Sequence, residues 1–447
     1  MSTVTTRIAP SPTGQMHIGT VRSALFNYLW AKHNKGTFLI RIEDTDTERN
    51  RSEWTQMIWD VFEWCGLTPD KKYIQSEHAS RHRELLEKLV QEGKAYVSRE
   101  PSKNDPSIEV AVIRLKNPGK TVVFNDLIHG DITFDTTELG DFVIARSIED
   151  PLYHFAVVVD DADAQVSHVI RGEDILSSTP RQILIQEALG FSRPIYAHLP
   201  LILSADRKKL SKRHHVVSLA DYRNEGILPE AMVNYLALLG WNPGTDEEHF
   251  SLEQLIERFS FDGVQKSGAI FDRTKLLSVN QHWMRNLSDD DFLAHLARFD
   301  LANFARSNLA KAVPLLKERT HTFAEARDML SSELSCLFSE PTLDRNQLSL
   351  KEPKECPGMT KNALESLLEP LKALPEGVSA EAVKEVIMPL ANEEEARGKG
   401  GRGALLWPLR YALSGQERSP DPFTLVSILG VEETISRIRK AIAILEG

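Results

Sequence analysis

The first 66 residues alternate between two hydrophobic periods, and this alternation constrains the fold more than any other feature of the chain. The run VTTRIA (4–9) has the composition of a short strand, and APSPTG (9–14) is too rich in proline and glycine to extend it. From Ile18 the apolar residues recur at helical spacing, and Gly36 is a candidate helix stop. A second strand (37–44) and a second helix (51–66) follow. This order predicts an α/β domain with a parallel sheet.

A third helix is expected over 79–93, and after it the pattern changes to short β-rich runs between turn signals. These runs are EVAVIRLK, TVVFNDL, DITFD, DFVIAR and HFAVVVDD. We interpret 95–150 as a small α+β insertion. SHVIRGED then returns to a strand, and 178–190 is expected to be a helix with Thr179 as its N-cap and Gly190 as its end. The run 194–204 is expected to be one more strand.

From residue 218 onward we expect helices and no further strands. A chain of 447 residues is too long for one hydrophobic core, so several domains are expected. The predicted fold class is α/β, with a Rossmann-like parallel-sheet catalytic domain, a small α+β insertion and an all-α C-terminal half. The expected boundaries are 1–94 and 151–217 for the two parts of the catalytic domain, 95–150 for the insertion, and 218–310 and 311–447 for two helical domains.

Composition limits the class of protein. The formal net charge is −11, which argues against binding nucleic acid over the whole surface but leaves room for a local basic site. No run of about 18 apolar residues predicts a membrane span, and the N-terminus has no secretory pattern. The three cysteines, Cys65, Cys336 and Cys356, are far apart in sequence, which is typical of a reducing compartment. We therefore expect a cytoplasmic protein.

One short loop carries much of the positive charge. LSADRKKLSKR (203–213) has five cations within seven positions, from Arg207 to Arg213. Such a run is often only a solvated face. This one follows the strand expected at 194–204, and open α/β sheets bind ligands at the carboxyl ends of their strands. Lysines there could stabilise charge on a triphosphate during nucleotidyl transfer, so we expect the partner anion to be ATP.

The loop APSPTGQMHIGT (9–20) is a second candidate anion site. It joins a strand to a helix N-terminus, where free backbone N–H groups and the helix dipole attract phosphate. His17 could donate to a phosphate oxygen, and Gly19 would let a base or ribose approach the backbone. The alternative is an ordinary turn in which His17 caps the helix or packs against it.

These two segments carry a family resemblance. PSPTGQMHIGT, followed about 190 residues later by KLSKR, resembles the paired HIGH and KMSKS signatures of class I aminoacyl-tRNA synthetases. Thr20 replaces the last histidine of the first signature, and Leu210 and Arg213 replace residues of the second. RIAPSPTG, RIEDTD, VIRGED, STPRQ and LPEAMVNYLALLGW resemble the glutamyl-tRNA synthetase family specifically. The similarity covers at least 4–285 and, more weakly, WPLRYALSG (407–415).

The resemblance implies that glutamate is activated with ATP and then transferred to the 3′ end of tRNA(Glu). It places Arg7, Arg171 and Tyr153 against the substrate, Glu43 against its α-ammonium group, and Ser11 in a hydrogen bond to it. An arginine is physically suitable because a buried carboxylate needs a fixed cation, and a guanidinium can bind both of its oxygens. The alternative is an internal salt bridge, between Arg7 and Glu43 or between Arg171 and Asp174.

The resemblance also implies an ATP site and its cofactor. The implied catalytic residues are His17, Lys209 and Lys212, with Lys212 on the triphosphate and Lys209 assisting it. Mg²⁺ would accompany ATP, held mainly by phosphates and water. The family further implies a monomer, and adenylate formation that requires bound tRNA. The implied ATP-binding residues are Pro10, Thr13, Gly14, His17, Gly19, Lys209, Ser211 and Lys212.

The chain departs from its relatives in the insertion. Many of them hold zinc there with cysteine and histidine, but residues 95–120 contain neither, so no structural zinc is expected. We still assign the insertion to the tRNA acceptor end.

The helical half would read the unstacked anticodon. Arg410 is the candidate contact, whereas packing is the preferred interpretation of Trp407 and Tyr411. The stretch 369–383 lacks arginine, which some relatives use to reject tRNA(Gln). Charging of tRNA(Gln) with glutamate therefore remains open.

Four other functions compete with this one. A glutaminyl-tRNA synthetase would share the catalytic half but usually continues into β-barrels. A glutamyl synthetase that acts on a modified tRNA base would lack the helical half. A small-molecule nucleotidyltransferase would not need the helical half or the arginine-lined pocket. A silent paralogue that only binds tRNA would have little reason to keep both His17 and Lys212.

Overall fold

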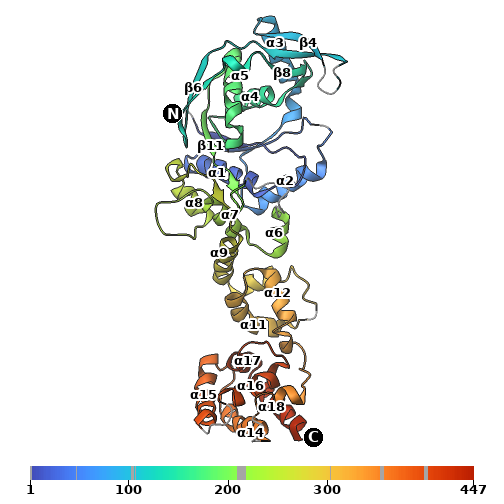
Figure 1. The fold of residues 1–447 in the computed structure, drawn as a ribbon, viewed down its shortest axis with the longest axis vertical. Coiled ribbons are helices and arrows are strands. Elements are labelled where there is room, and N and C mark those ends of the chain that lie inside the picture. The colour runs from blue at the N-terminus through green and yellow to red at the C-terminus, as the bar shows by residue number, and fades with distance from the viewer. Residues whose placement is uncertain are drawn as a thin grey trace. The chain divides into compact units, whose positions relative to one another are not determined.

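The computed structural model describes residues 3–46, 48–101, 105, 107–208, 218–302, 304–352, 357–396 and 401–446. The chain forms two compact units, one up to residue 280 and one from residue 281 onward. Figure 1 shows the α/β elements in the first unit and the helices of the second. No helix in the described part is both long and apolar enough to cross a membrane.

A parallel three-stranded sheet opens the first unit, as expected. Its order is β1-β2-β3, with Arg7 opposite Leu39 and Leu39 opposite Lys71. Helices α1, α2 and α3 alternate with these strands. The elements are β1 (Thr5–Ile8), α1 (Ile18–His33), β2 (Thr37–Ile42), α2 (Ser52–Trp64), β3 (Lys71–Ile74) and α3 (Ala79–Gln91).

Gly36 has a different role from the predicted helix stop. Helix α1 ends at His33 with Asn34 as its C-cap. A Cβ atom on Gly36 would lie only 2.1 Å from the carbonyl oxygen of Val4. Glycine is therefore needed for the close approach of the turn to the segment that precedes β1.

The second sheet has the order β10-β11-β6-β7. Strand β10 (His168–Gly172) is parallel to β11 (Ile195–Leu199), which meets β6 (Thr121–Asp126) at Tyr196 and Asp126. Strand β7 (Gly130–Asp135) forms a hairpin with β6. Strands β1 and β10 lie side by side, because the Thr5 N–H donates to Ser167 Oγ at 2.8 Å and the Ser167 N–H donates to Thr5 O at 3.0 Å.

A third, antiparallel sheet has the order β4-β5-β8-β9. It contains β4 (Ala95–Pro101), β5 (Glu109–Leu115), β8 (Phe142–Ser147) and β9 (Asp150–Pro151). The β6–β7 hairpin lies between β5 and β8 in sequence but joins the sheet of β10 and β11. Part of the segment expected as an insertion is thus continuous with that sheet.

The run HFAVVVDD was wrongly expected to be β-rich, because it lies in helix α4 (Tyr153–Asp163). Every residue from Phe155 to Asp161 is buried, so the helix is covered on all sides. A helix of that kind shows no amphipathic period, and its short apolar run cannot be distinguished from a buried strand by periodicity.

The segment 194–204 is also broken. It forms β11 and the two-residue strand β12 (Ile202–Leu203), and Pro200 lies in the gap. Strand β12 pairs with β13 (Ala269–Ile270). The expectation of no strand after residue 218 was therefore wrong, because this two-residue strand is present. The remaining helices of the first unit are α5 (Thr179–Leu189), α6 (Leu219–Glu225), α7 (Pro229–Leu238) and α8 (Leu252–Arg258).

Helix α9 (Arg273–Asn286) contains the boundary, and the described part of the second unit is helical, as predicted. Its core gathers buried leucine, valine, isoleucine and alanine side chains of α14 to α18. The α-helices are α10 (Asp289–Leu296), α11 (Arg306–Arg319), α12 (Phe323–Ser331), α13 (Arg345–Leu348), α14 (Met359–Lys372), α15 (Ala380–Ala396), α16 (Gly403–Ser414), α17 (Pro422–Leu429) and α18 (Val431–Glu446).

Candidate active site

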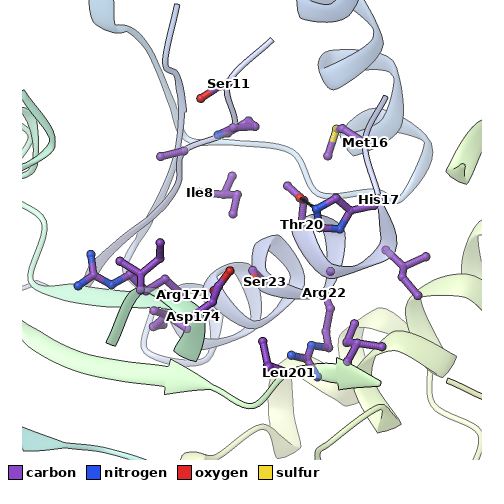
Figure 2. Close-up of a pocket in the computed structure, with 18 of the residues that line it drawn as sticks. Ile8, Ser11, Met16, His17, Thr20, Arg22, Ser23, Arg171, Asp174 and Leu201 are labelled. Atoms are coloured by element: carbon purple, nitrogen blue, oxygen red, sulfur yellow. Dashed lines mark hydrogen bonds between the residues drawn. The ribbon is translucent and has the colours of Figure 1, made fainter. Parts of the chain in front are cut away.

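A cavity of about 550 Å³ opens where β1 and β10 end and α1 begins. Three arginines line it, Arg7, Arg22 and Arg171, and the only carboxylate among its described lining residues is Asp174. Figure 2 shows His17 and Thr20 at the start of α1, with Arg171 and Asp174 in another part of the pocket. The excess of cations suits an anionic ligand. Of the predicted site residues, the lining includes Arg7, Pro10, Ser11, Thr13, Gly14, His17, Gly19, Tyr153 and Arg171.

His17 occupies the N-cap position of α1 with extended backbone angles. Its side chain makes no capping hydrogen bond, so the alternative of an ordinary capping histidine is not supported. The exposed imidazole lies 3.5 Å from Thr20 Oγ1, measured at Nε2. A Cβ atom on Gly19 would lie 3.0 Å from Nδ1 of that ring. Gly19 therefore leaves space for the imidazole beside the helix N-terminus.

Arg7 is held by a carboxylate far away in sequence. Its Nε donates to Asp161 Oδ1 at 3.0 Å, and Asp161 also accepts from Arg41 Nη1 at 2.6 Å. Arg7 is 4% exposed. Its ion pair is thus with Asp161 of α4, and the alternative of a salt bridge to Glu43 was wrong. Because only Nε of Arg7 is engaged by this pair, its terminal nitrogens can face a ligand.

Glu43 does not line the cavity. Its side chain accepts from Arg41 Nη2 at 3.1 Å, and its backbone N–H donates to Pro10 O at 3.1 Å. Burial raises the pKa of the Glu43 carboxyl, although Arg41 and Arg7 oppose the rise. The structure therefore places Glu43 behind the loop that contains Pro10.

Arg171 is buried without a carboxylate partner in the described part of the chain. Its Nε donates to His198 Nε2 at 3.2 Å, Nη1 donates to Gln182 Oε1 at 2.7 Å, and Nη2 donates to Thr179 Oγ1 at 2.8 Å. The expected alternative, an ion pair with Asp174, is absent among these contacts. Burial lowers the pKa of the Arg171 guanidinium. A buried cation surrounded by neutral acceptors is well suited to bind an incoming anion.

Thr179 was wrongly expected to be the N-cap of α5. The N-cap is Ser178, and Thr179 begins the helix. The Thr179 hydroxyl is instead used to hold Arg171. Gly190 ends the helix in the left-handed conformation, as predicted. Tyr153 begins α4, lines the cavity and is 44% exposed as a residue.

Arg22 was not among the predicted site residues. This residue is buried in α1, where Nη1 donates to Leu239 O at 3.1 Å and Nη2 donates to Pro200 O. Burial lowers its pKa to about 10, and Glu173 opposes the change. Arg22 ties the helix that begins beside His17 to the segment that leads into the basic loop. The available signal was a single arginine within an apolar helical run.

Three predicted residues, Lys209, Ser211 and Lys212, lie outside the described residues. The described start of their loop leaves the cavity at Ile202. Backbone bonds hold this segment, since the Phe271 N–H donates to Leu203 O at 2.8 Å and the Ser204 N–H donates to Lys208 O at 2.9 Å.

Arg410 lies in the second unit and is engaged with its own neighbourhood. Its Nη2 donates to Glu417 O at 2.8 Å, and its guanidinium lies 4.9 Å from the centre of the Trp407 ring. Trp407 Nε1 donates to Gln347 O at 2.8 Å, and Tyr411 is buried. Both aromatic residues therefore pack within the helices, as preferred from the sequence. Within the described ranges, no group of three or more histidine, cysteine or acidic side chains could hold a metal ion.

Comparisons with known proteins extend over the whole chain. Residues 3–105 and 98–278 match the model of the class I tRNA synthetase (E and Q) catalytic domain, and 286–442 match an anticodon binding domain. A glutamate–tRNA ligase of Carboxydothermus hydrogenoformans is 38% identical over 97% of this chain and 99% of its own. One of Dehalococcoides mccartyi is 39% identical over 98% and 97%.

A solved structure is also similar to this chain over its full length. The crystal structure of a glutamate tRNA ligase from Elizabethkingia meningosepticum, in complex with its amino acid, superposes with a TM-score of 0.86 at 32% identity. The alignment covers 99% of this chain and 100% of that one. The cavity at the start of α1, the two matched domains and the full-length relatives agree, and the chain belongs to the E and Q family of class I tRNA synthetases.

Proposed function

We propose that this chain is a glutamate–tRNA ligase, which joins L-glutamate to the 3′ end of tRNA(Glu) at the expense of ATP. One observation carries the proposal. Arg171 is a buried guanidinium without a carboxylate partner among the described residues, and it lines the same cavity as Arg7 and His17. A ligand with a carboxylate side chain supplies the missing anion, and the helix N-terminus beside it supplies a phosphate site.

Arg7 and Arg171 form the binding site for glutamate, which we call the amino-acid seat. The terminal nitrogens of Arg7 and Arg171 bind the glutamate side-chain carboxylate, and Tyr153 covers it from the start of α4. Ser11 donates a hydrogen bond to the substrate. Glu43 supplies negative charge for the α-ammonium group from behind the loop, beside Pro10. Fixed donors of this kind avoid the high cost of burying an uncompensated carboxylate.

The nucleotide lies along the loop that precedes α1. Pro10, Thr13, Gly14 and Gly19 shape this surface, and His17 donates to a phosphate oxygen. Lys209 and Lys212, with Ser211 between them, stabilise the charge that develops on the α-phosphate. Mg²⁺ would accompany ATP with phosphate oxygens and water as its ligands, in keeping with a cavity whose described lining has one carboxylate.

The reaction has two steps. In the first, an α-carboxylate oxygen of glutamate attacks the α-phosphorus of ATP. The bond between the α-phosphorus and the oxygen that bridges it to the β-phosphorus breaks, and diphosphate leaves with the electron pair of that bond. In the second, a terminal ribose hydroxyl of tRNA attacks the acyl carbon, and AMP leaves. Neither step needs a protein nucleophile, so positioning and charge stabilisation account for most of the rate.

The rest of the chain is assigned to tRNA. Residues 95–150 bind the acceptor end, 218–310 contact the stem, and 311–447 read the anticodon, with Arg410 as a contact. The match of 286–442 to an anticodon binding domain supports the last assignment. We further propose a cytoplasmic monomer without structural zinc. The stretch 369–383 contains no arginine, so charging of tRNA(Gln) with glutamate stays open and is measured alongside that of tRNA(Glu).

A charging assay tests the proposal. The full chain is incubated with ATP, Mg²⁺ and labelled glutamate or glutamine, together with a tRNA(Glu) or tRNA(Gln) transcript. We expect glutamate to be attached to tRNA(Glu), and glutamine to be attached to neither tRNA. Charging with glutamine, or no charging with either amino acid, would overturn the proposed substrate.

A further inference from the structure

Arg171 is connected to a buried histidine–carboxylate pair outside the cavity lining. His198 of β11 and Asp126 of β6 are both buried, and His198 Nδ1 lies 2.7 Å from Asp126 Oδ2. On the other side of the ring, His198 Nε2 lies 3.2 Å from Arg171 Nε. Three neighbouring strands of one sheet thus each contribute one residue to a continuous chain of hydrogen bonds.

Arg171 determines which tautomer His198 adopts. The guanidinium Nε can only donate, so His198 Nε2 must accept and carry no proton. The ring proton is therefore on Nδ1 and is donated to Asp126. Burial and the nearby Arg171 lower the pKa of His198, although its hydrogen bond to the Asp126 carboxylate opposes this, and the lowered pKa agrees with a neutral ring. The other titratable groups beside the ring are His129 and Tyr196.

Asp126 is held as an acceptor by backbone donors. Its Oδ1 accepts from the N–H groups of Ile128 and His129, both at 3.0 Å, and Oδ2 accepts from the His198 N–H at 3.1 Å as well as from the ring. Burial acts to raise the pKa of this carboxyl, but these hydrogen bonds outweigh it and hold the pKa below its usual value. Asp126 is therefore ionised and cannot donate to His198.

The donor count of Arg171 gives this arrangement its consequence. A guanidinium has five N–H groups, and His198, Gln182 and Thr179 accept three of them. One N–H remains on each terminal nitrogen, which is the number a carboxylate can accept in a bidentate pair. These three hydrogen bonds together fix the plane of the guanidinium and the direction of its two remaining donors, and His198 is the residue that holds Nε.

We propose that Asp126 and His198 are positioning residues for Arg171, and that they aim its two remaining N–H groups at the side-chain carboxylate of the substrate. This inference rests on the proposed glutamate seat. It also means that β6, which lies within the segment 95–150, helps to orient the amino-acid site through Asp126 as well as contributing to the fold around it.

Asp126→Asn is the sharpest test because it keeps the shape and changes the donor pattern. Its amide oxygen is expected at the Oδ1 position, where two backbone N–H groups donate. The amide NH₂ would then face His198 Nδ1 and drive the ring proton to Nε2, against Arg171 Nε. We expect the KM for glutamate in tRNA(Glu) charging to rise about 10- to 100-fold, as for a slightly misplaced binding group. The KM for ATP should change less than about 3-fold, because neither Asp126 nor His198 is among the described residues that line the cavity.

Two substitutions of His198 separate its roles. His198→Gln can place an amide oxygen near the Nε2 position and so still accept from Arg171, whereas His198→Asn reaches only the Asp126 side of the site. We expect His198→Gln to keep the KM for glutamate within about 5-fold of the wild-type value. We expect His198→Asn to raise that KM as much as Asp126→Asn does. A merely structural role would show no such difference between the two.

His82→Asn is the matched control. His82 and Asp160 form another buried histidine–carboxylate pair, with Nε2 2.6 Å from Oδ1, that does not contact Arg171. The melting temperature of His82→Asn is expected to fall about as much as that of Asp126→Asn, while the KM of His82→Asn for glutamate stays near the wild-type value. An unchanged KM for glutamate in folded Asp126→Asn, or equal increases for glutamate and ATP, would overturn the positioning role alone. Failure of the wild type to charge glutamate would instead overturn the proposed function and, with it, this inference.

Discussion

Replacing Arg171 tests the amino-acid seat more severely than any other single change. Arg171→Ala removes a buried cation that has only neutral partners among the described residues: His198, Gln182 and Thr179. Arg171→Lys keeps the charge but loses the planar fork. The two variants therefore separate the contribution of charge from that of bidentate geometry.

The magnitude follows from the donors that remain on Arg171. Two N–H groups are left for the substrate, and a hydrogen bond to a charged group contributes about 1.5–3 kcal/mol. Arg171→Ala should therefore cost about 3–6 kcal/mol, or about 10²–10⁴ in kcat/KM for glutamate. In the proposed site Arg7 would still bind the carboxylate, which favours the lower part of that range. Arg171→Lys should lose one such bond, which corresponds to about 10- to 150-fold.

The assay is charging of tRNA(Glu) at saturating ATP and tRNA, with glutamate varied. The melting temperature and the KM for ATP serve as controls, because neither depends on the glutamate contact. Loss of less than about 3-fold in kcat/KM for folded Arg171→Ala would refute the assignment, since even one lost charge-assisted bond exceeds that value. Equal losses in the lysine and alanine variants would show that bidentate geometry dominates over charge.

Three further predictions concern other parts of the chain. Lys212→Ala should lower the turnover of glutamate activation about 10²- to 10³-fold while leaving the Kd for tRNA nearly unchanged, and equal damage to both would identify the basic loop as a nucleic-acid patch. Gly36→Ala should destabilise the first unit by about 1–3 kcal/mol, seen as a lower melting temperature, because its Cβ would lie 2.1 Å from Val4 O; an unchanged melting temperature would contradict the close packing. Cys65 should resist alkylation at pH 8 in the native protein, since burial raises its pKa to about 12 and the thiol stays protonated below that value; rapid labelling of its peptide, followed by mass spectrometry, would contradict this.

The order of strands and helices around the site was predictable because each element has a clear period. The strand that ends near Arg7, the Pro/Gly loop and the helix that begins at Ile18 all follow from local sequence. Helix α4 did not, because a helix buried on all sides has no polar face to reveal its period. The error mattered, since α4 carries both Tyr153 and Asp161.

The residues proposed to contact the substrate were easier to identify than the residues that hold them. Arg171 and Arg7 lie in recognisable motifs. Their partners lie far away in sequence, with Asp161 154 positions from Arg7 and Asp126 72 positions from His198. Pairing over such separations depends on how the strands assemble, so these partners cannot be predicted from local patterns in a single sequence. Local patterns could therefore identify the arginines that line the cavity but not the partners that hold them in place.

The most direct test of this account is a structure of the chain with a non-hydrolysable glutamyl-adenylate analogue bound. The account predicts the side-chain carboxylate at about 2.7–2.9 Å from terminal nitrogens of both Arg7 and Arg171, with the adenosine along the loop that ends at His17. An analogue bound in another cavity, or in this one with its carboxylate turned away from both guanidinium groups, would contradict it.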